Sequence, residues 1–288
     1  MTSPLYPTDS LEKAGCPRVA GLFVFRRFGG ADSAADPRRW QNSAMRNPRL
    51  SSLPWLSLML LLLATAPALA EEEPAEKNAD KTVRTALFVI AEGVYNSELM
   101  APYDVLQHTI FRDENDYIAT AVVSHDGKPV LTFEEITVVP HYSFADAPKA
   151  DILVIPSTRG SMDRDLKDEV YMAWIEKAVA EAEWVITVCD GAFPLAAIGA
   201  LDGRVATTFP GDRERFREMF PKVDMRDDVR LVVDGKYITS VGGGMSYEPA
   251  FYLVERLYGK EHVDRSARGL VWPWDLQTVP HTIVPSTE

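Results

Sequence analysis

The stretch Trp184-Val185-Ile186-Thr187-Val188-Cys189-Asp190-Gly191-Ala192-Phe193 joins a short apolar run to a polar corner. A nearly continuous apolar run is typical of a strand that is buried on both faces of a parallel sheet. Cys189 ends the run, Gly191 follows two residues later, and 192–200 has the composition of a helix. A strand that turns this sharply into a helix exposes its corner residue beside the helix N-terminus. The pattern predicts a nucleophile elbow with Cys189 at the corner.

Two interpretations of Cys189 follow from this position. The free N–H groups and the dipole at a helix N-terminus lower the pKa of a nearby thiol, so we expect a value well below the ordinary one of about 8.5. A free cysteine is also often a small core residue, and an inert buried thiol is the alternative.

The N-terminal part of the chain contains the ordered features of a secretory signal. Met45 is a second plausible start, Arg46 and Arg49 form a positive region, and 53–63 is apolar and rich in leucine. Ala68-Leu69-Ala70 has the small residues of a cleavage site. This order predicts a signal peptide that is cleaved after Ala70, with an uncleaved anchor as the alternative. The mature protein would then be exported, periplasmic or secreted, with no membrane association.

Cleavage at this position would leave 218 residues, which suits one α/β domain. Cys16 would be lost with the leader, so Cys189 would be a lone thiol that cannot form an internal disulfide. A lone thiol in an oxidising compartment is either buried or used. We predict five segments: a disordered leader or mis-assigned start (1–44), a signal peptide (45–70), a linker (71–83), a folded domain (84–275) and a C-terminal tail (276–288).

The charge balance argues against nucleic acid as a partner. The chain has 30 basic and 42 acidic residues, and its formal net charge is −12. Phosphate binding requires a basic face, which such a chain does not readily provide. No group of His, Cys and Asp has the spacing of metal ligands, so we expect neither a metal nor a cofactor.

The rest of the sequence alternates between strand and helix patterns. Apolar runs predict buried strands, and the 3.6-residue spacing of apolar side chains predicts helices. This alternation predicts an α/β fold, a three-layer α/β/α sandwich with a mostly parallel, flavodoxin-like central sheet. The expected strands are 85–91, 117–124, 151–156 and 184–188, with hairpins at 130–139 and 229–241; the expected helices include 97–111, 168–182, 212–220, 247–258 and 261–269.

Four segments together resemble the ThiJ/PfpI family of the class I glutamine amidotransferase-like superfamily. They are 93–105, 151–156, 188–208 and 239–259. The resemblance covers nearly all of 84–272 and is nearest to the subgroup of isonitrile hydratase and amidase-like regulator domains. It implies the sandwich fold, with a nucleophile at Cys189.

The resemblance also implies partners for the nucleophile. Glu98 stands four residues before Pro102, where the family places an acidic residue, and would exchange protons with Cys189. The backbone N–H of Asp190, together with that of Ser157 or Thr158, would stabilise a developing anion. The alternative for Glu98 is an exposed acid that favours the helix dipole.

This sequence departs from the family pattern at three places. Phe209 stands where many relatives have a catalytic His, so a Cys189–Glu98 dyad without histidine is expected. Ser157 and Thr158 replace the Gly-Gly of the oxyanion loop. Asp190 replaces a threonine, and its negative charge would raise the pKa of the thiol.

The leading hypothesis is an exported cysteine-dependent hydrolase or hydratase whose substrate is a small electrophile. A non-catalytic ligand-binding or cysteine redox-sensing domain is the alternative, and a structural protein that has kept only the fold is a third. We also expect a homodimer, because Trp272 and Trp274 would form a costly apolar patch in water. The alternative is that this segment folds back over its own domain as a clasp.

Overall fold

The computed structural model describes residues 83–285 of the 288-residue chain. The predicted leader (1–44), signal peptide (45–70) and nearly all of the linker (71–83) lie outside the described residues. Between residues 83 and 285, no helix has both the length and the apolar character needed to cross a bilayer.

A central eight-stranded sheet forms the middle of the molecule, in the order β12-β10-β11-β7-β6-β1-β2-β5. Neighbouring strands are parallel except for the antiparallel pair β10 and β11. The strands are β1 (Arg84–Val89), β2 (Ile118–Ser124), β5 (Tyr142–Ser143), β6 (Ile152–Ile155), β7 (Trp184–Val188), β10 (Leu231–Asp234), β11 (Tyr237–Ser240) and β12 (His281–Val284).

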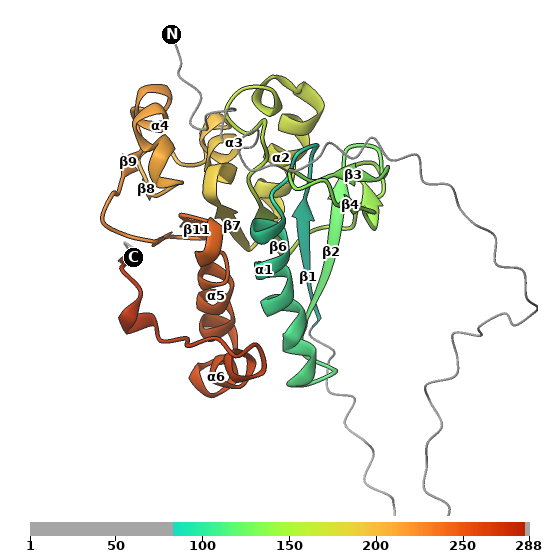
Figure 1. Cartoon of the computed structure of the whole chain (residues 1–288), viewed down its shortest axis with the longest axis vertical. Helices are drawn as coiled ribbons and strands as arrows, with labels where there is room; N and C mark the ends of the chain where they lie inside the picture. The colour runs from blue at the N-terminus through green and yellow to red at the C-terminus, as the bar shows by residue number, and fades with distance from the viewer. Residues whose placement is uncertain (1–82, 286–288) are drawn as a thin grey trace, which may run out of the picture. The chain divides into compact units, whose positions relative to one another are not determined.

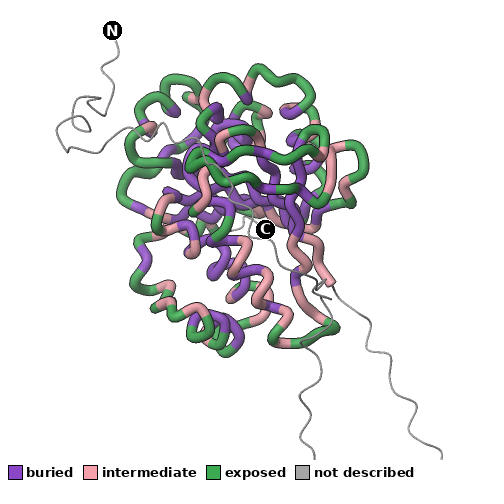
Figure 2. Tube along the Cα trace, turned by 45° about the vertical axis from the view of Figure 1, so that its right-hand side comes forward, coloured by how far each residue is buried: buried purple, intermediate pink, exposed green. Residues whose placement is uncertain are grey.

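Helices cover both faces of this sheet and create two separate cores (Figures 1 and 2). One core packs side chains of α1, α5 and α6 against the sheet, and the other packs those of α2, α3 and α4. The predicted three-layer sandwich is therefore confirmed. The helices are α1 (Asn96–Gln107), α2 (Glu169–Glu181), α3 (Ala192–Ala197), α4 (Arg213–Met219), α5 (Glu248–Tyr258) and α6 (Lys260–Gly269).

Local sequence signals explain several element boundaries. Asp168 caps α2, because its carboxylate accepts the backbone N–H groups of Val170 and Tyr171. The Asp234-Gly235 turn joins β10 to β11, with Gly235 at φ 60°.

Two small strand pairs lie outside the central sheet. The predicted hairpin at 130–139 is present as β3 (Val130–Leu131) and β4 (Thr137–Val138), and the other pair consists of β8 (Val205–Ala206) and β9 (Asp224–Met225). Short 3-10 turns occur at His108–Phe111 (η2), Asp165–Lys167 (η3), Cys189–Gly191 (η4), Pro210–Asp212 (η5), Gly243–Met245 (η6) and Leu276–Thr278 (η7).

The topology brings distant segments to one edge of the sheet. The chain leaves β1 through α1 to reach β2 on one side, and later returns through β6 on the other side of β1. In an open parallel sheet, such a reversal of strand order leaves a crevice at the carboxyl ends of the strands, where ligands bind. The segments that follow β1, β6 and β7 therefore converge at this edge.

The C-terminal boundary of the domain requires a correction. The sequence predicts a tail outside the domain at 276–288, but β12 pairs in parallel with β10, with His281 opposite Leu231. The strand is only four residues long and is bracketed by Pro280 and Pro285. Prolines are tolerated beside an edge strand but not within a central one. A short run between two prolines therefore does not show the sequence pattern of a central strand. The folded domain continues to at least Val284.

The tryptophan segment folds over its own domain. The Trp272 ring stacks on Tyr247 at 4.7 Å between centroids, and the Trp274 ring stacks on Phe251 at 5.5 Å. The indole Nε1 of Trp274 donates a hydrogen bond to Glu255 Oε2 at 2.7 Å. The clasp alternative is thus confirmed, and these tryptophans no longer provide a reason for pairing. The homodimer remains a prediction without this support.

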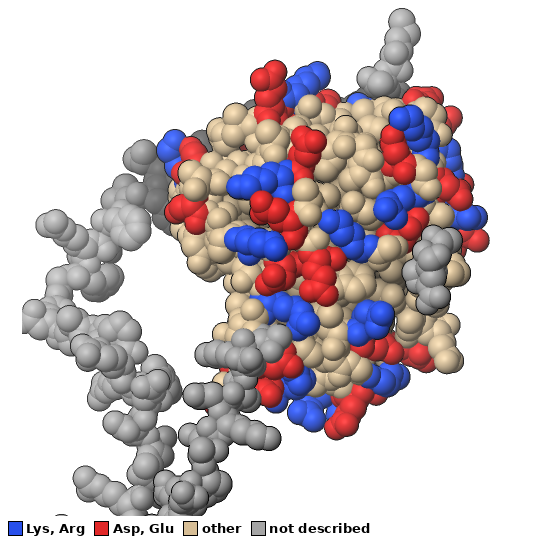
Figure 3. All heavy atoms as spheres, turned by 180° about the vertical axis from the view of Figure 1, so that it is seen from behind, with Lys and Arg blue, Asp and Glu red and all other residues tan. Residues whose placement is uncertain are grey.

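Charged residues of both signs alternate over the molecular surface. Figure 3 shows basic and acidic side chains interspersed on the face opposite the view of Figure 1. Pairs of opposite charge among the described residues include Lys222 with Asp202 and Arg226 with Asp224. The face shown in Figure 3 presents no broad area of one charge sign.

Candidate active site

Cys189 directly follows β7 and is the first residue of the turn η4, which continues into α3. The thiol therefore stands at the sharp corner between the strand and the helix. The φ angle of Cys189 is 58°, a left-handed conformation that is unusual for a residue other than glycine. Such strain persists only where the surrounding structure enforces it, and it is common at active sites. The predicted elbow geometry is therefore present.

Two glycines make room for this corner. A Cβ on Gly191 would lie 1.9 Å from the carbonyl oxygen of Ile155, at the end of β6. A Cβ on Gly242 would lie 2.4 Å from the Cβ of Cys189. Both distances are far inside van der Waals contact, so the elbow, β6 and the segment after β11 can approach one another only with glycine at these positions.

Glu98 comes from the first turn of α1 and reaches the thiol. Its side chain is buried, with 4% of the residue exposed. Oε2 accepts the backbone N–H of Ser157 at 3.1 Å, and the carboxyl group shares a hydrogen bond with the Cys189 thiol. Glu98 is therefore not the exposed first-turn acid that was the alternative interpretation of its position. The structure brings the two residues of the predicted dyad into direct contact.

Burial tunes the acidity of the Glu98 carboxyl. Loss of solvent raises the pKa of Glu98 from 4.5 to about 7, although hydrogen bonds from Cys189 and from the N–H groups of Ser157 and Gly243 partly oppose this change. At neutral pH the carboxyl group is therefore divided between its protonated and ionised forms. A group with this pKa can accept and return a proton under physiological conditions.

The thiol itself is less acidic than the sequence predicts. Burial raises the pKa of Cys189 well above its ordinary value, and the negative charges of Glu98 and Asp190 raise it further. The backbone N–H of Asp190 hydrogen-bonds to the sulfur and lowers the pKa, but it does not outweigh these effects. The expected acidic thiol is therefore contradicted, since an elbow motif in a sequence does not reveal how completely its corner is buried.

Asp190 forms a second buried carboxyl beside the thiol. Burial and the nearby charge of Asp212 raise the pKa of Asp190 to about 8. The Thr208 hydroxyl lies 3.1 Å from Asp190 Oδ1 and also donates to the backbone carbonyl of Cys189 at 2.9 Å. The hydrogen bond from Thr208 lowers the pKa of Asp190 and so opposes part of the effect of burial.

The loop proposed to form an oxyanion hole is engaged within the protein. The Ser157 N–H donates to Glu98, and the Thr158 N–H donates to Ser161 Oγ at 2.8 Å. The N–H of Asp190 points to the sulfur of Cys189. An anion could accept hydrogen bonds from the N–H groups of Ser157 and Thr158 only if these groups gave up their present acceptors, Glu98 and Ser161.

Several residues near the thiol have no obvious signal in the sequence. Tyr95 lies close enough that the charges of Glu98, Cys189 and Asp190 raise its pKa, after the larger effect of burial. The Tyr95 ring packs on Phe133 of the β3–β4 hairpin at 4.7 Å. These aromatic rings come from segments nearly forty residues apart, so only the fold shows that they are neighbours.

The five histidines of the chain make contacts elsewhere. The ring of His141 interacts with the Val122 N–H, that of His281 with the Val279 carbonyl, and that of His108 with Asp104. The rings of His125 and His262 pack on Phe144 and Tyr258, respectively. None of these contacts involves Cys189.

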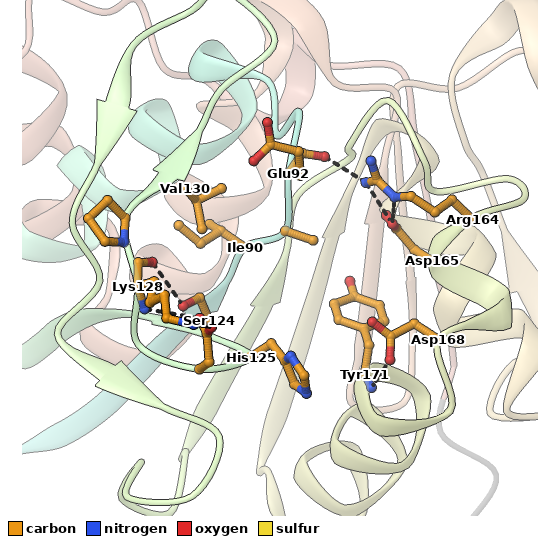
Figure 4. A pocket seen from close by; sticks show the side chains of 13 residues that line it. Ile90, Glu92, Ser124, His125, Lys128, Val130, Arg164, Asp165, Asp168 and Tyr171 are labelled. Carbon is orange, nitrogen blue, oxygen red and sulfur yellow. Dashed lines mark hydrogen bonds and ion pairs between the residues drawn. The ribbon is translucent and has the colours of Figure 1, made fainter.

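A cavity of about 520 Å³ lies at the same edge of the sheet (Figure 4). Its walls include Ile90 and Val130 on one side, with Asp165 and Tyr171 on the other. Cys189 and Glu98 do not line it, so the cavity and the dyad are separate features. The Thr158 hydroxyl donates to Asp165 and connects the cavity wall to the loop that binds Glu98. Within residues 83–285, no group of three or more His, Cys, Asp and Glu side chains is arranged to hold a metal ion.

Comparison with known proteins connects this arrangement to a family. The chain is 24% identical over 202 residues to protein DJ-1alpha of Drosophila melanogaster. The matched region covers 69% of this chain and 89% of that protein. It is 27% identical over 175 residues to isonitrile hydratase of Pseudomonas putida, which covers 60% and 71%, respectively.

A solved structure shows the same fold. The crystal structure of Drosophila melanogaster DJ-1beta has 25% sequence identity and a TM-score of 0.59, and it covers 67% of this chain and 100% of that one. The family model described as the DJ-1/PfpI family matches residues 84–256, which contain both Glu98 and Cys189. This chain belongs to the DJ-1/PfpI family.

Proposed function

We propose that this protein adds water to a small electrophilic carbon, with Cys189 as the nucleophile and Glu98 as the proton carrier. The observation that carries the proposal is the hydrogen-bonded pair itself, in which a buried carboxyl group with a pKa of about 7 contacts the thiol. A thiol with a raised pKa holds its proton at neutral pH. It becomes a nucleophile when an adjacent base removes that proton during attack.

The burial of the thiol limits the substrate. Only 6% of Cys189 is exposed, so a slim molecule is favoured over a bulky or branched one. Isonitriles have a terminal, two-coordinate carbon, and a relative of this chain is named isonitrile hydratase. We therefore take a small isonitrile as the substrate class to test first, with small amides and reactive aldehydes next.

The proposed reaction begins with attack of the Cys189 sulfur on the isonitrile carbon. As the S–C bond forms, the thiol proton passes to the Glu98 carboxylate, and Glu98 then delivers it to the same carbon, which gives a thioimidate. Glu98, again ionised, removes a proton from a water molecule that adds to this carbon. The S–C bond breaks as the nitrogen is protonated and the sulfur recovers a proton, and the N-substituted formamide leaves. The net change is the addition of one water molecule.

The direct test is hydration of n-propyl isocyanide, a small unbranched isonitrile, followed by the appearance of the formamide proton in NMR spectra. Glu98→Gln should lower the rate by about 10²–10⁴ because the proton carrier is lost, and Cys189→Ser should abolish turnover. Asp104→Asn removes another acid of the same helix, one that is 45% exposed, and should leave the rate unchanged. Formamide production by Cys189→Ser at the wild-type rate would exclude the mechanism.

A redox-sensing role is the second candidate, and one observation favours it. The Asp190 N–H and the Glu98 carboxyl both reach the sulfur, so each could hydrogen-bond an oxygen atom added to it. Intact mass after peroxide treatment distinguishes the two roles. Stoichiometric gain of oxygen at Cys189, without turnover of any electrophile, would favour sensing over catalysis.

We also propose that the protein is exported. The proposal rests on the positive region at Arg46 and Arg49, the apolar run 53–63 and the small residues at Ala68 and Ala70. N-terminal sequencing of protein recovered from the periplasm or the medium should begin at Glu71. A mature chain that begins at Met45 would contradict cleavage.

A further inference from the structure

A second cavity, of about 410 Å³, lies between η2 and α6. It is lined by His108, Phe111, Arg112, His262, Arg265 and Ser266, together with Gly269. The volume falls within the range of pockets that bind small organic molecules. None of the residues discussed for the dyad contributes to it.

Two buried polar side chains in this cavity lack partners. His262 is 6% exposed and Ser266 is 7% exposed, and both line the cavity from one face of α6. Among residues 83–285, neither the imidazole nitrogens of His262 nor the hydroxyl group of Ser266 forms a hydrogen bond; the imidazole only packs edge-on against the Tyr258 ring. Their polar atoms are not among the fully buried atoms without partners, so they remain open to the cavity and can hydrogen-bond an occupant there.

The charged groups of the cavity wall have one sign. Arg112 and Arg265 line the cavity, and no acidic residue does. The Arg265 side chain is 53% exposed, and it lies 3.5 Å from the carboxylate of Glu261, whose side chain is 93% exposed. An exposed pair of this kind contributes little, so the Arg265 guanidinium can engage a different anion at small cost.

The wall also offers apolar contact. Phe111 is 75% exposed at the rim of the cavity, although an aromatic ring of this size is costly to leave in water. The Arg112 guanidinium lies 4.4 Å from the centre of the Tyr258 ring and also pairs with Asp116, and these contacts together hold its position beside the cavity. An occupant therefore needs both an anionic group and an apolar part.

We infer that the cavity between η2 and α6 binds a small organic carboxylate with an apolar chain or ring. The carboxylate would accept hydrogen bonds from Arg265, His262 and Ser266, and the apolar part would lie against Phe111. Because the cavity shares no residue with the Cys189–Glu98 pair, this binding site is independent of the proposed reaction.

Calorimetric titration of the full-length protein with octanoate tests this inference. We expect binding of one octanoate per chain, with octan-1-ol and sulfate each at least about tenfold weaker, because each lacks one of the two recognised parts. The ring resonances of His262, assigned by their loss in His262→Gln, should shift on addition of octanoate. Binding of sulfate as tight as that of octanoate would overturn the inference.

Matched variants locate the site. Arg265→Gln should weaken octanoate binding about tenfold, since a charged hydrogen-bond donor is lost. Arg268→Gln alters a neighbouring exposed arginine of α6 that does not line the cavity, and should bind as the wild type does. Cys189→Ser should also bind normally. Equal affinity in Arg265→Gln and the wild type, or loss of binding in Cys189→Ser, would contradict this location.

Discussion

A Cβ placed on Gly242 would lie 2.4 Å from the Cβ of Cys189, so the segment after β11 fixes the space beneath the thiol. Gly242 has φ 76°, and Cys189 itself has φ 58°. Two residues with positive φ from distant parts of the chain therefore pack against each other at the elbow, and the conformation is strained for Cys189 but not for the glycine. The position of the sulfur relative to Glu98 depends on this contact as well as on the turn after β7.

Gly242→Ala should destabilise the protein by about 2 kcal/mol or more, because the added methyl group meets Cys189 and the left-handed backbone disfavours alanine. Alkylation of Cys189 should change as well, since the elbow must shift. Gly244→Ala is the matched control, because a Cβ there meets no atom within 4 Å. Chemical denaturation measures the difference, and equal stabilities of the two variants would show that the packing at Gly242 is not restrictive.

Glu98→Gln should increase stability at neutral and higher pH. The pKa of Glu98 rises from 4.5 to about 7 on folding, so the folded state binds the proton more tightly than the unfolded state does. In the wild type this contribution is full below pH 4.5 and is lost as the pH rises through about 7. The glutamine side chain does not titrate, so the variant should gain up to about 3 kcal/mol relative to the wild type at about pH 8.

Unfolding curves at about pH 4 and about pH 8 measure this difference. The introduced glutamine can still accept the Ser157 N–H through its carbonyl oxygen, so the local hydrogen bond survives the change. A difference in unfolding free energy between variant and wild type that is the same at both pH values would mean that Glu98 has an ordinary pKa.

Asp190→Asn should lower the pKa of the Cys189 thiol. The Asp190 carboxylate raises that pKa through its negative charge, while the backbone N–H at position 190 that reaches the sulfur is retained in the variant. The rate of iodoacetamide alkylation should therefore rise at a lower pH than in the wild type. Glu214→Gln removes an exposed acid of α4 and should leave the profile unchanged; a coincident profile for Asp190→Asn would remove Asp190 from the electrostatics of the site.

Trp274→Phe tests the clasp. The variant keeps most of the ring stacking on Phe251 but loses the hydrogen bond to Glu255, so it should be less stable by about 1–2 kcal/mol. Light scattering should give the same mass for variant and wild type, since Trp274 is covered by its own domain. A change in mass without a change in stability would instead assign Trp274 to an interface between chains.

The sequence predicts the layered fold well because that fold depends on local patterns. Apolar runs such as 184–188 and 151–156 have no other stable place than a covered parallel sheet, and the helices between them show clear 3.6-residue spacing. The strand β12 is missed because four residues between two prolines carry no such pattern. The clasp and the dimer are indistinguishable in the sequence, since both bury Trp272 and Trp274.

The candidate site is predicted only in part. Family resemblance places Glu98 and Cys189 together, and the structure shows their contact. The acidity of the thiol is predicted wrongly because it depends on how Glu98 and Asp190 are buried around it. The roles of Thr208 and Gly242 depend on contacts between segments that lie far apart in the chain, and no local pattern encodes them.

The most direct test of the proposed mechanism is a titration of the Glu98 carboxyl group by ¹³C NMR, with Glu98→Gln to assign its resonance. We predict a pKa of about 7, because the buried carboxyl must be able to take and return the Cys189 proton at neutral pH. A resonance that titrates at the ordinary value of 4.5 would contradict the mechanism, since Glu98 would then be a solvated carboxylate rather than the proton carrier of the thiol.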